Sequence, residues 1–277
     1  GGIHICLSEK EFAGRKAQLE ILYSHQNGKF KYEMLDRKAL LDIQPGLGPD
    51  VVGGSWCPHD GHVNPLYLLR SLHNCFLKRN GQLLHDAEVF DINHGEGVFD
   101  VFSRKGQFKA PCLVLAAGLG NRKLAPLIGL KQPVRPQKGQ ILVTQKIDKL
   151  IDVPMTLLRQ TAEGSIMIGD SKEEVGFDIS SSIDIMAQIA DRARRTLPVL
   201  EKQQIIRSWA ALRVMSPDGF PMYDQSESCP GGFAITCHSG VTLAAAHCFD
   251  MAADIEAGNF SVGLQSFSER RFDVSAN

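Results

Sequence analysis

One stretch near the C-terminus most constrains the fold of this chain. Residues 209–223 read as a strand, a tight turn at Pro217-Asp218-Gly219 and a second strand. Residues 231–242 add a short buried strand at 233–236 and a glycine-bearing turn, which opens a helix expected from about Val241 to Ala257. A strand that enters a helix through small residues aims main-chain N–H groups and the positive end of the helix dipole at one point. Small residues also let a ligand approach the main chain closely, so this turn predicts a ligand site.

Two further segments have the pattern of α/β layers. Residues 111–120 form a buried strand that ends in small residues, and a helix is expected to follow from about Asn121. This ending is a weak signal by itself, because parallel α/β proteins contain many such strands. Earlier, Asn64 and Pro65 are typical of a helix start, and three strands are expected after that helix, near Gln82–Leu84, Ala87–Ile92 and Val98–Ser103.

The remaining segments have a different pattern. Ser8-Glu-Lys-Glu11 is a capping box that begins a helix to about His25, and Asp36 caps a second, short helix. Strands of an antiparallel sheet are expected at Ile141–Thr144, Thr156–Gln160 and Ser165–Gly169, followed by an amphipathic helix over Ser181–Thr196. The two patterns alternate along the chain, which predicts two spatial domains, each built from separated segments.

Composition excludes several classes of function. The 277 residues carry a net charge of −1, so a nucleic-acid partner is not expected. No apolar run approaches the roughly 20 residues that span a bilayer. The seven cysteines are scattered without a Cys-x-x-Cys pair, which indicates reduced thiols in a cytoplasmic protein. No metal site is expected, and the alternative of a metal or disulfide role for Cys237 and Cys248 is less favoured than small core residues.

The segments described above, taken together, resemble the D-amino-acid oxidase/glycine oxidase family of flavoproteins. The resemblance rests on four motifs. They are Arg213 with Asp218-Gly-Phe-Pro221 a few residues later, Cys237-His-Ser-Gly240, Asp60-Gly-His-Val-Asn-Pro65 and Pro133-Val-Arg-Pro-Gln-Lys-Gly-Gln140. Val214 stands where the family has proline, and Cys237 where it has glycine. The sequence of residues 236–245 resembles the flavin subunits of opine oxidase and hydrogen cyanide synthase more closely than it resembles glycine oxidase.

The resemblance implies an FAD-binding Rossmann-like domain, interleaved with an antiparallel-sheet substrate domain, in a mixed α/β and α+β fold. Residues 62–131 and 205–277 would form the FAD-binding domain, and residues 1–61 and 132–204 the substrate domain. Residues implied to contact FAD are Val89, Ala117, Gly118, Leu119, Ser239, Gly240, Val241 and Thr242. Arg213 would bind the substrate carboxylate and His238 would act beside the flavin, with helix capping as its alternative role. Arg135 and Lys138 would contact flavin or phosphate, or be solvated hinge residues.

One element of the family is absent from the sequence. The strand, Gly-x-Gly-x-x-Gly turn and helix that hold the pyrophosphate, with the acidic residue that follows them, are not found. We therefore expect a truncated chain or a fragment, with an incomplete Rossmann-like domain that binds FAD weakly or not at all.

The resemblance also implies the chemistry: oxidation of an amino acid or secondary amine, with hydride transfer from the substrate Cα to flavin N5. Three alternatives follow. The chain is a stand-alone oxidase or dehydrogenase, the flavin subunit of a heteromeric opine or imino-acid dehydrogenase that needs a second subunit, or a non-catalytic fragment that does not hold FAD.

Overall fold

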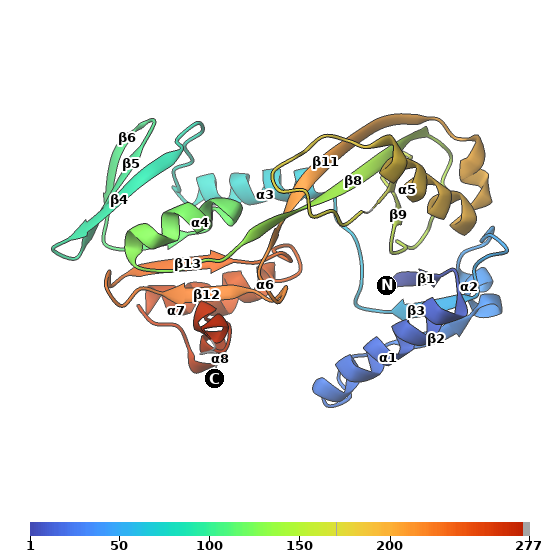
Figure 1. Ribbon diagram of the computed structural model, residues 1–277, viewed down its shortest axis with the longest axis horizontal. Helices are drawn as coiled ribbons and strands as arrows, with labels where there is room; N and C mark the ends of the chain where they lie inside the picture. Colours follow the sequence, from blue (N-terminus) through green and yellow to red (C-terminus); the bar gives the residue numbers. More distant parts are fainter. Residues whose placement is uncertain (170, 274–277) are drawn as a thin grey trace. The chain divides into compact units, whose positions relative to one another are not determined.

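The computed structural model describes residues 1–169 and 171–273, and it divides the chain into two compact units (Figure 1). Within the described residues, unit 1 contains 1–80, 138–173 and 178–211, and unit 2 contains 81–137, 174–177 and 212–277. Each unit thus combines three separated stretches of sequence. The assignment of the segments to a substrate domain and a cofactor domain stays a prediction.

Unit 1 is built on two sheets. The first has the antiparallel order β1-β3-β2, with β1 Gly2–Cys6, β2 Glu33–Asp36 and β3 Gly53–Cys57. The second has the order β11-β8-β10-β9, with β8 Arg135–Lys146, β9 Leu158–Gln160, β10 Ser165–Ile168 and β11 Ile205–Met215. A parallel bridge between Ile3 and Met155 connects the first sheet to the loop before β9.

Unit 1 contains five helical segments, and capping side chains mark the start of three of them. They are α1 Glu9–His25, α2 Arg37–Ile43, α3 Pro65–Lys78, α5 Ile183–Thr196 and the short 3-10 helix η3 Pro198–Lys202. Ser8 Oγ accepts a hydrogen bond from the N–H of Glu11 at 3.2 Å, and Asp36 Oδ1 accepts one from Ala39 at 2.8 Å. Asn64 Oδ1 caps α3 by accepting hydrogen bonds from the N–H groups of Leu66 and Tyr67. These expected helix starts are confirmed.

The core of unit 1 lies between its sheets and helices. It is a cluster of buried aliphatic side chains that includes Ile3, Ile5, Leu40, Leu142, Leu158, Ile166, Ile168, Ile189 and Leu197. Helix α5 contributes through Ile189 and Ala193, as its amphipathic pattern predicts. Helix α3 differs, because it has no buried residue.

Unit 2 also contains two sheets. The first has the order β12-β13-β7, with β7 Leu113–Leu115, β12 Met222–Gln225 and β13 Gly232–Thr236. Strand β13 is antiparallel to β12 and parallel to β7. The second is the antiparallel meander β4-β5-β6, with β4 Val89–Gly95, β5 Val98–Ser103 and β6 Gly106–Ala110. The strand expected near Gln82–Leu84 is wrong, because these residues have no regular secondary structure.

The helical segments of unit 2 are short. They are η1 Gly118–Gly120, α4 Asn121–Leu124, η2 Ala125–Ile128, α6 Ala244–Ala246, the π-helix η4 His247–Met251, α7 Ala252–Glu256, α8 Val262–Gln265 and η5 Glu269–Phe272. The helix expected from about Val241 therefore starts three residues later, at Ala244. The N–H of Leu243 bonds to the carbonyl of Ser239, four residues back, whereas that of Ala244 bonds to Val241, three back. This mixed pattern makes a turn of residues 240–243 rather than α-helix.

Two apolar clusters hold unit 2 together. One joins Ile92 and Phe99 of the meander to Leu115, Ile128 and Ala234. The other joins Tyr223, Phe233, Met251 and Phe260. Over residues 1–169 and 171–273, no helix combines the length and apolarity that a membrane crossing requires.

Candidate functional site

The strands β7 and β13 bring two predicted ligand-binding turns to one edge of a sheet. The strands are parallel neighbours, with Leu113 opposite Gly232 and Leu115 opposite Ala234. Their carboxyl ends consequently meet at the same edge, which is where ligands bind in open α/β sheets. Residues 117–119 follow β7, and residues 239–242 follow β13.

Both turns expose main chain and small side chains. Ala117 and residues 239–242 are exposed, whereas Leu115 and Ala234, which precede them, are 5% and 0% exposed. Gly118 has φ +58°, and a β-carbon there would lie 3.3 Å from Val214 Cγ2. Val214 directly follows Arg213 on β11, so the turn after β7 packs against the strand end that carries the predicted carboxylate-binding arginine.

Asn121 joins the first turn to the end of β13. This side chain is fully buried, and its Oδ1 accepts a hydrogen bond from the N–H of Ala117 at 3.0 Å. Its Nδ2 donates to the carbonyl of Leu115 at 3.0 Å, to the carbonyl of Ile235 at 3.2 Å and to Thr236 Oγ1 at 2.8 Å. Sequence reasoning treated Asn121 only as the start of a helix, since partners more than a hundred residues away leave no local signal.

The other predicted site residues lie on different elements of unit 2. Val89 begins β4 and packs against the apolar cluster that contains Leu115. Arg213 is half-buried on β11. His238 is exposed after β13, with its Nδ1 3.3 Å from Ser239 Oγ. The alternative role of His238 as a helix cap stays a prediction, and α6 begins six residues after it, at Ala244.

A tyrosine–histidine pair joins β12 to the π-helix that follows the second turn. Tyr223 on β12 is 5% exposed, and its hydroxyl lies 2.8 Å from Nε2 of His247, the first residue of the π-helix. Burial raises the pKa of Tyr223 to about 12 and lowers the pKa of His247. Both side chains are therefore neutral at pH 7. The sequence showed no sign of this pair.

The two cations of the predicted hinge are paired with carboxylates. Lys138 is 3% exposed, and its Nζ lies 2.9 Å from Asp178 and 3.3 Å from Glu173. Arg135 forms an ion pair with Glu174. The solvated role considered for Lys138 is therefore wrong, and its contact with flavin or phosphate stays a prediction.

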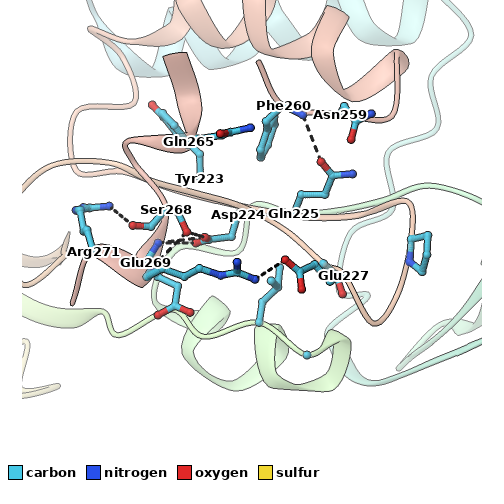
Figure 2. Close-up of a pocket in the computed structure, with 15 residues that line it drawn as sticks. Tyr223, Asp224, Gln225, Glu227, Asn259, Phe260, Gln265, Ser268, Glu269 and Arg271 are labelled. Carbon is cyan, nitrogen blue, oxygen red and sulfur yellow. Dashed lines mark hydrogen bonds and ion pairs between the residues drawn. The ribbon is translucent and has the colours of Figure 1, made fainter. Parts of the chain in front are cut away.

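A cavity of about 790 Å³ in unit 2 is lined by none of the predicted site residues (Figure 2). At its wall, Asp224 accepts hydrogen bonds from Gln132 at 2.6 Å, from Ser268 at 2.7 Å and from the N–H of Glu269 at 3.0 Å. Burial raises the pKa of both Asp224 and Glu269. Because these bonds tie β12 to the segment after α8, we interpret the Asp224 network as structural.

The edge formed by β7 and β13 fits a dinucleotide. Its turns offer main-chain groups, Ala117 and Gly118 leave room for close approach, and Asn121 holds the first turn against the end of β13. Such a cradle suits a ligand that is bound chiefly through the main chain.

Comparisons with known proteins identify the family. The sequence model of the DAO family, described as FAD dependent oxidoreductase, matches residues 1–253. A subunit of the opine oxidase of Agrobacterium tumefaciens (strain Ach5) is 42% identical over 273 residues, which cover 98% of this chain and 74% of that protein.

Solved structures share the fold. L-proline dehydrogenase from P. horikoshii matches with a TM-score of 0.86 at 21% identity, over 98% of this chain and 76% of that one. Glycine oxidase from Geobacillus kaustophilus matches with a TM-score of 0.84 at 22% identity, over 100% of this chain and 75% of that one. The expected fold class, cofactor and family are thus confirmed, and the chain belongs to the DAO family of FAD-dependent oxidoreductases.

Proposed function

We propose that this protein oxidises an amino acid or a secondary amine, with FAD held at the edge formed by β7 and β13. The observation that carries the proposal is the meeting of the two turns there, with the strand end after Arg213 packed against Gly118. Unit 2 is accordingly the cofactor unit and unit 1 the substrate unit.

Each proposed site residue has a distinct task. Ala117, Gly118 and Leu119 line the cofactor through their main chain, and Val89 contributes at its adenine end. The N–H groups of Ser239, Gly240, Val241 and Thr242 stabilise negative charge that develops on the cofactor ring.

Arg213 and His238 act on the substrate side. The Arg213 guanidinium binds the substrate carboxylate by two parallel hydrogen bonds, which orients the Cα–H bond. His238, exposed beside Ser239, exchanges protons between the amine and solvent. FAD, when bound, supplies the acceptor for the hydride.

The first experiment is a visible absorption spectrum of the purified protein, before and after incubation with FAD and desalting. A retained flavin spectrum that bleaches on anaerobic addition of an amino acid or secondary amine would support the proposal and overturn the expectation of weak or no FAD binding. A protein that stays colourless would support the alternative of a fragment without FAD and contradict the proposed activity of this chain.

The second experiment assigns Arg213. Arg213→Ala is expected to lower kcat/KM by roughly a hundredfold, because a charged hydrogen bond contributes about 1.5 to 3 kcal/mol. Arg213→Lys should recover part of the loss. Arg207→Ala is the matched control, since Arg207 lies on the same strand and stacks over Trp209, 5.3 Å from the ring centroid. Equal effects of the two alanine variants would make Arg213 structural.

A second candidate function is that of a flavin subunit in a heteromeric dehydrogenase. The 42% identity to a subunit of opine oxidase supports it. Such an enzyme should reduce a dye quickly and oxygen slowly until its partner protein is added. Rapid reoxidation of the isolated protein by oxygen would instead indicate a stand-alone oxidase. The cytoplasmic location expected from the cysteines stays a proposal.

A further inference from the structure

The cavity of about 790 Å³ in unit 2 has no role in the proposed oxidation. Its wall includes residues 223–227 at the end of β12, Phe260, and residues 268–271. A cavity of this size accommodates a small organic ligand. None of the residues assigned to FAD or to the substrate lines it, so a ligand of its own is open to inference.

The topology of the sheet separates this cavity from the turn that follows β13. Strand β12 is antiparallel to β13, with Met222 opposite Thr236 and Gln225 opposite Phe233. Strand β12 therefore runs away from the turn of residues 239–242 and ends beside the amino end of β13. The cavity is lined by the residues at this end of β12, so its ligand is not the cofactor proposed for the other end.

Two buried acidic residues, Asp224 and Glu269, line the cavity (Figure 2). They are 5% and 9% exposed. The carboxylate of Asp224 has protein donors on both of its oxygens, since Oδ2 accepts from Gln132 and Oδ1 accepts from Ser268 and from the N–H of Glu269. Asp224 thus fixes the main chain at Glu269 and needs no further partner.

The side-chain carboxylate of Glu269 has no such donors. Among residues 1–169 and 171–273 it accepts no hydrogen bond and forms no ion pair. The two cations whose charges act on it are engaged elsewhere, because Lys131 lies 3.3 Å from Asp273 and Arg270 lies 2.6 Å from Glu227. Burial and the neighbouring carboxylates raise the pKa of Glu269. The cavity is therefore lined by a carboxylate that is nine-tenths buried and lacks a hydrogen-bond donor.

These conditions favour a cationic ligand. A buried carboxylate without a donor is costly, and a second carboxylate nearby adds to the cost. An ammonium group offsets both costs, because it brings a positive charge and up to three N–H donors. The rings of Tyr223 and Phe260 on the wall suit the apolar body of an organic cation. A metal ion is less suited, because the described part of the chain has no group of three or more metal-binding side chains.

We propose that this cavity binds a small organic ammonium ion, which donates hydrogen bonds to the carboxylate of Glu269. Asp224 holds the main chain of Glu269 and adds negative potential, while Tyr223 and Phe260 contact the apolar body of the ligand. The site lies wholly within unit 2 and uses none of the residues assigned to the oxidation. The inference is therefore independent of the proposed function.

The test compares an ammonium ion with a neutral molecule of the same shape. The probes are tert-butylammonium and tert-butanol, and calorimetry at about pH 8 measures their binding to the purified protein with the FAD that it retains. The carbon that carries the nitrogen in tert-butylamine has no C–H bond, so the proposed oxidation does not consume this probe. The ammonium ion should bind at one site, at least roughly tenfold more tightly than the alcohol, and leave the flavin absorption spectrum unchanged.

Variants of two glutamates then locate the bound cation. Glu269→Gln should raise the dissociation constant of tert-butylammonium by roughly tenfold or more and leave that of tert-butanol unchanged. Glu227→Gln is the matched control, because it makes the same change of charge on the same wall, at a carboxylate already paired with Arg270. Thermal melting identifies any variant that fails to fold. The comparison of the two probes on the wild-type protein then decides the outcome by itself.

Several results would overturn the inference. They are equal binding of the two probes, binding of neither, and equal losses of ammonium binding in the two glutamine variants. Binding that shifts the flavin spectrum would also overturn it, because the ammonium ion would then lie beside the cofactor. None of these results bears on the proposed oxidation, which is tested by the bleaching of the flavin.

Discussion

Arg271 donates two parallel hydrogen bonds to the carboxylate of Asp218, from Nε to Oδ2 at 2.8 Å and from Nη2 to Oδ1 at 3.0 Å. The same guanidinium donates to the carbonyl of Pro221 at 2.9 Å. Asp218 Oδ1 in turn accepts the N–H of Phe220 at 3.0 Å. This contact between residues 53 positions apart therefore holds the turn that follows β11, the strand of Arg213.

The ion pair between Asp218 and Arg271 predicts how the free energy of unfolding depends on pH. Hydrogen bonding to Arg271 lowers the pKa of Asp218 to about 2, from an ordinary value of 3.8. The ionised form is stabilised by folding, so its contribution is present above pH 3.8 and is lost as the pH falls through about 2. Asp218→Asn should lower the free energy of unfolding at pH 7 by about 1 kcal/mol, since the pair is partly exposed.

Urea unfolding of wild type and Asp218→Asn at pH 7 and near pH 2 checks this prediction. The difference in unfolding free energy should shrink at the lower pH. Asp250→Asn, at an exposed carboxylate in the same unit, is the control and should have little effect at either pH. A difference between wild type and Asp218→Asn that does not change with pH would show that the carboxylate charge is not its cause.

Asn121→Ala should damage both stability and cofactor retention. The substitution leaves the N–H of Ala117 and the hydroxyl of Thr236 without their buried partner, at a cost of about 2 to 4 kcal/mol. Chemical unfolding and fluorescence titration with FAD measure the two effects. Asn93→Ala, at an exposed position of β4, is the control. Normal FAD affinity in a destabilised Asn121→Ala would mean that the bridge serves the fold and not the cofactor site.

Gly118→Ala should be destabilising by about 1 to 2 kcal/mol, because φ is +58° and the new β-carbon would lie 3.3 Å from Val214. The double variant Gly118→Ala with Val214→Ala removes the close contact but not the backbone strain, so it should recover only part of the loss. Gly240→Ala is the matched control for stability, since its β-carbon would be in ordinary contact with Cys237 Sγ at 3.7 Å. Thermal melting of these variants would contradict the prediction if Gly118→Ala matched Gly240→Ala.

His4 predicts a second pH dependence, in unit 1. Burial, together with Arg15 and Arg192, lowers the pKa of His4 to about 4 from an ordinary 6.5. The unfolded chain takes up this proton first, so stability falls as the pH drops from 6.5 towards about 4. His4→Gln should flatten that slope in urea unfolding measured between about pH 7 and pH 4.5. His25→Gln, at the exposed end of α1, should leave the slope unchanged.

Much of the fold and part of the candidate site were predictable from the sequence. The capping side chains of Ser8, Asp36 and Asn64 accept hydrogen bonds from N–H groups only two or three residues later. The local sequence is therefore enough to predict these helix starts. The glycine-bearing turns and the resemblance to the flavoprotein family likewise depend on short, contiguous segments. For the same reason, the family and its cofactor were predicted correctly.

Errors arose where a local pattern competed with a distant contact. The last helix starts late and includes a π-helical segment, whose first residue, His247, bonds to Tyr223 on β12. Lys138 was expected to be solvated if it did not contact the cofactor, but it is buried and forms ion pairs with Glu173 and Asp178. Neither the late start of the last helix nor the burial of Lys138 can be predicted from the residues that flank them in the sequence.

The sequence by itself thus determined the family, the cofactor, most helix starts and the identity of the turns, because these depend on side-chain types at short spacing. Only the tertiary structure decided that β7 lies parallel to β13, that Asn121 bridges their ends and that Tyr223 bonds to His247. Those features arise from burial and from hydrogen bonds between distant segments, whose pairing is established only when the whole chain packs.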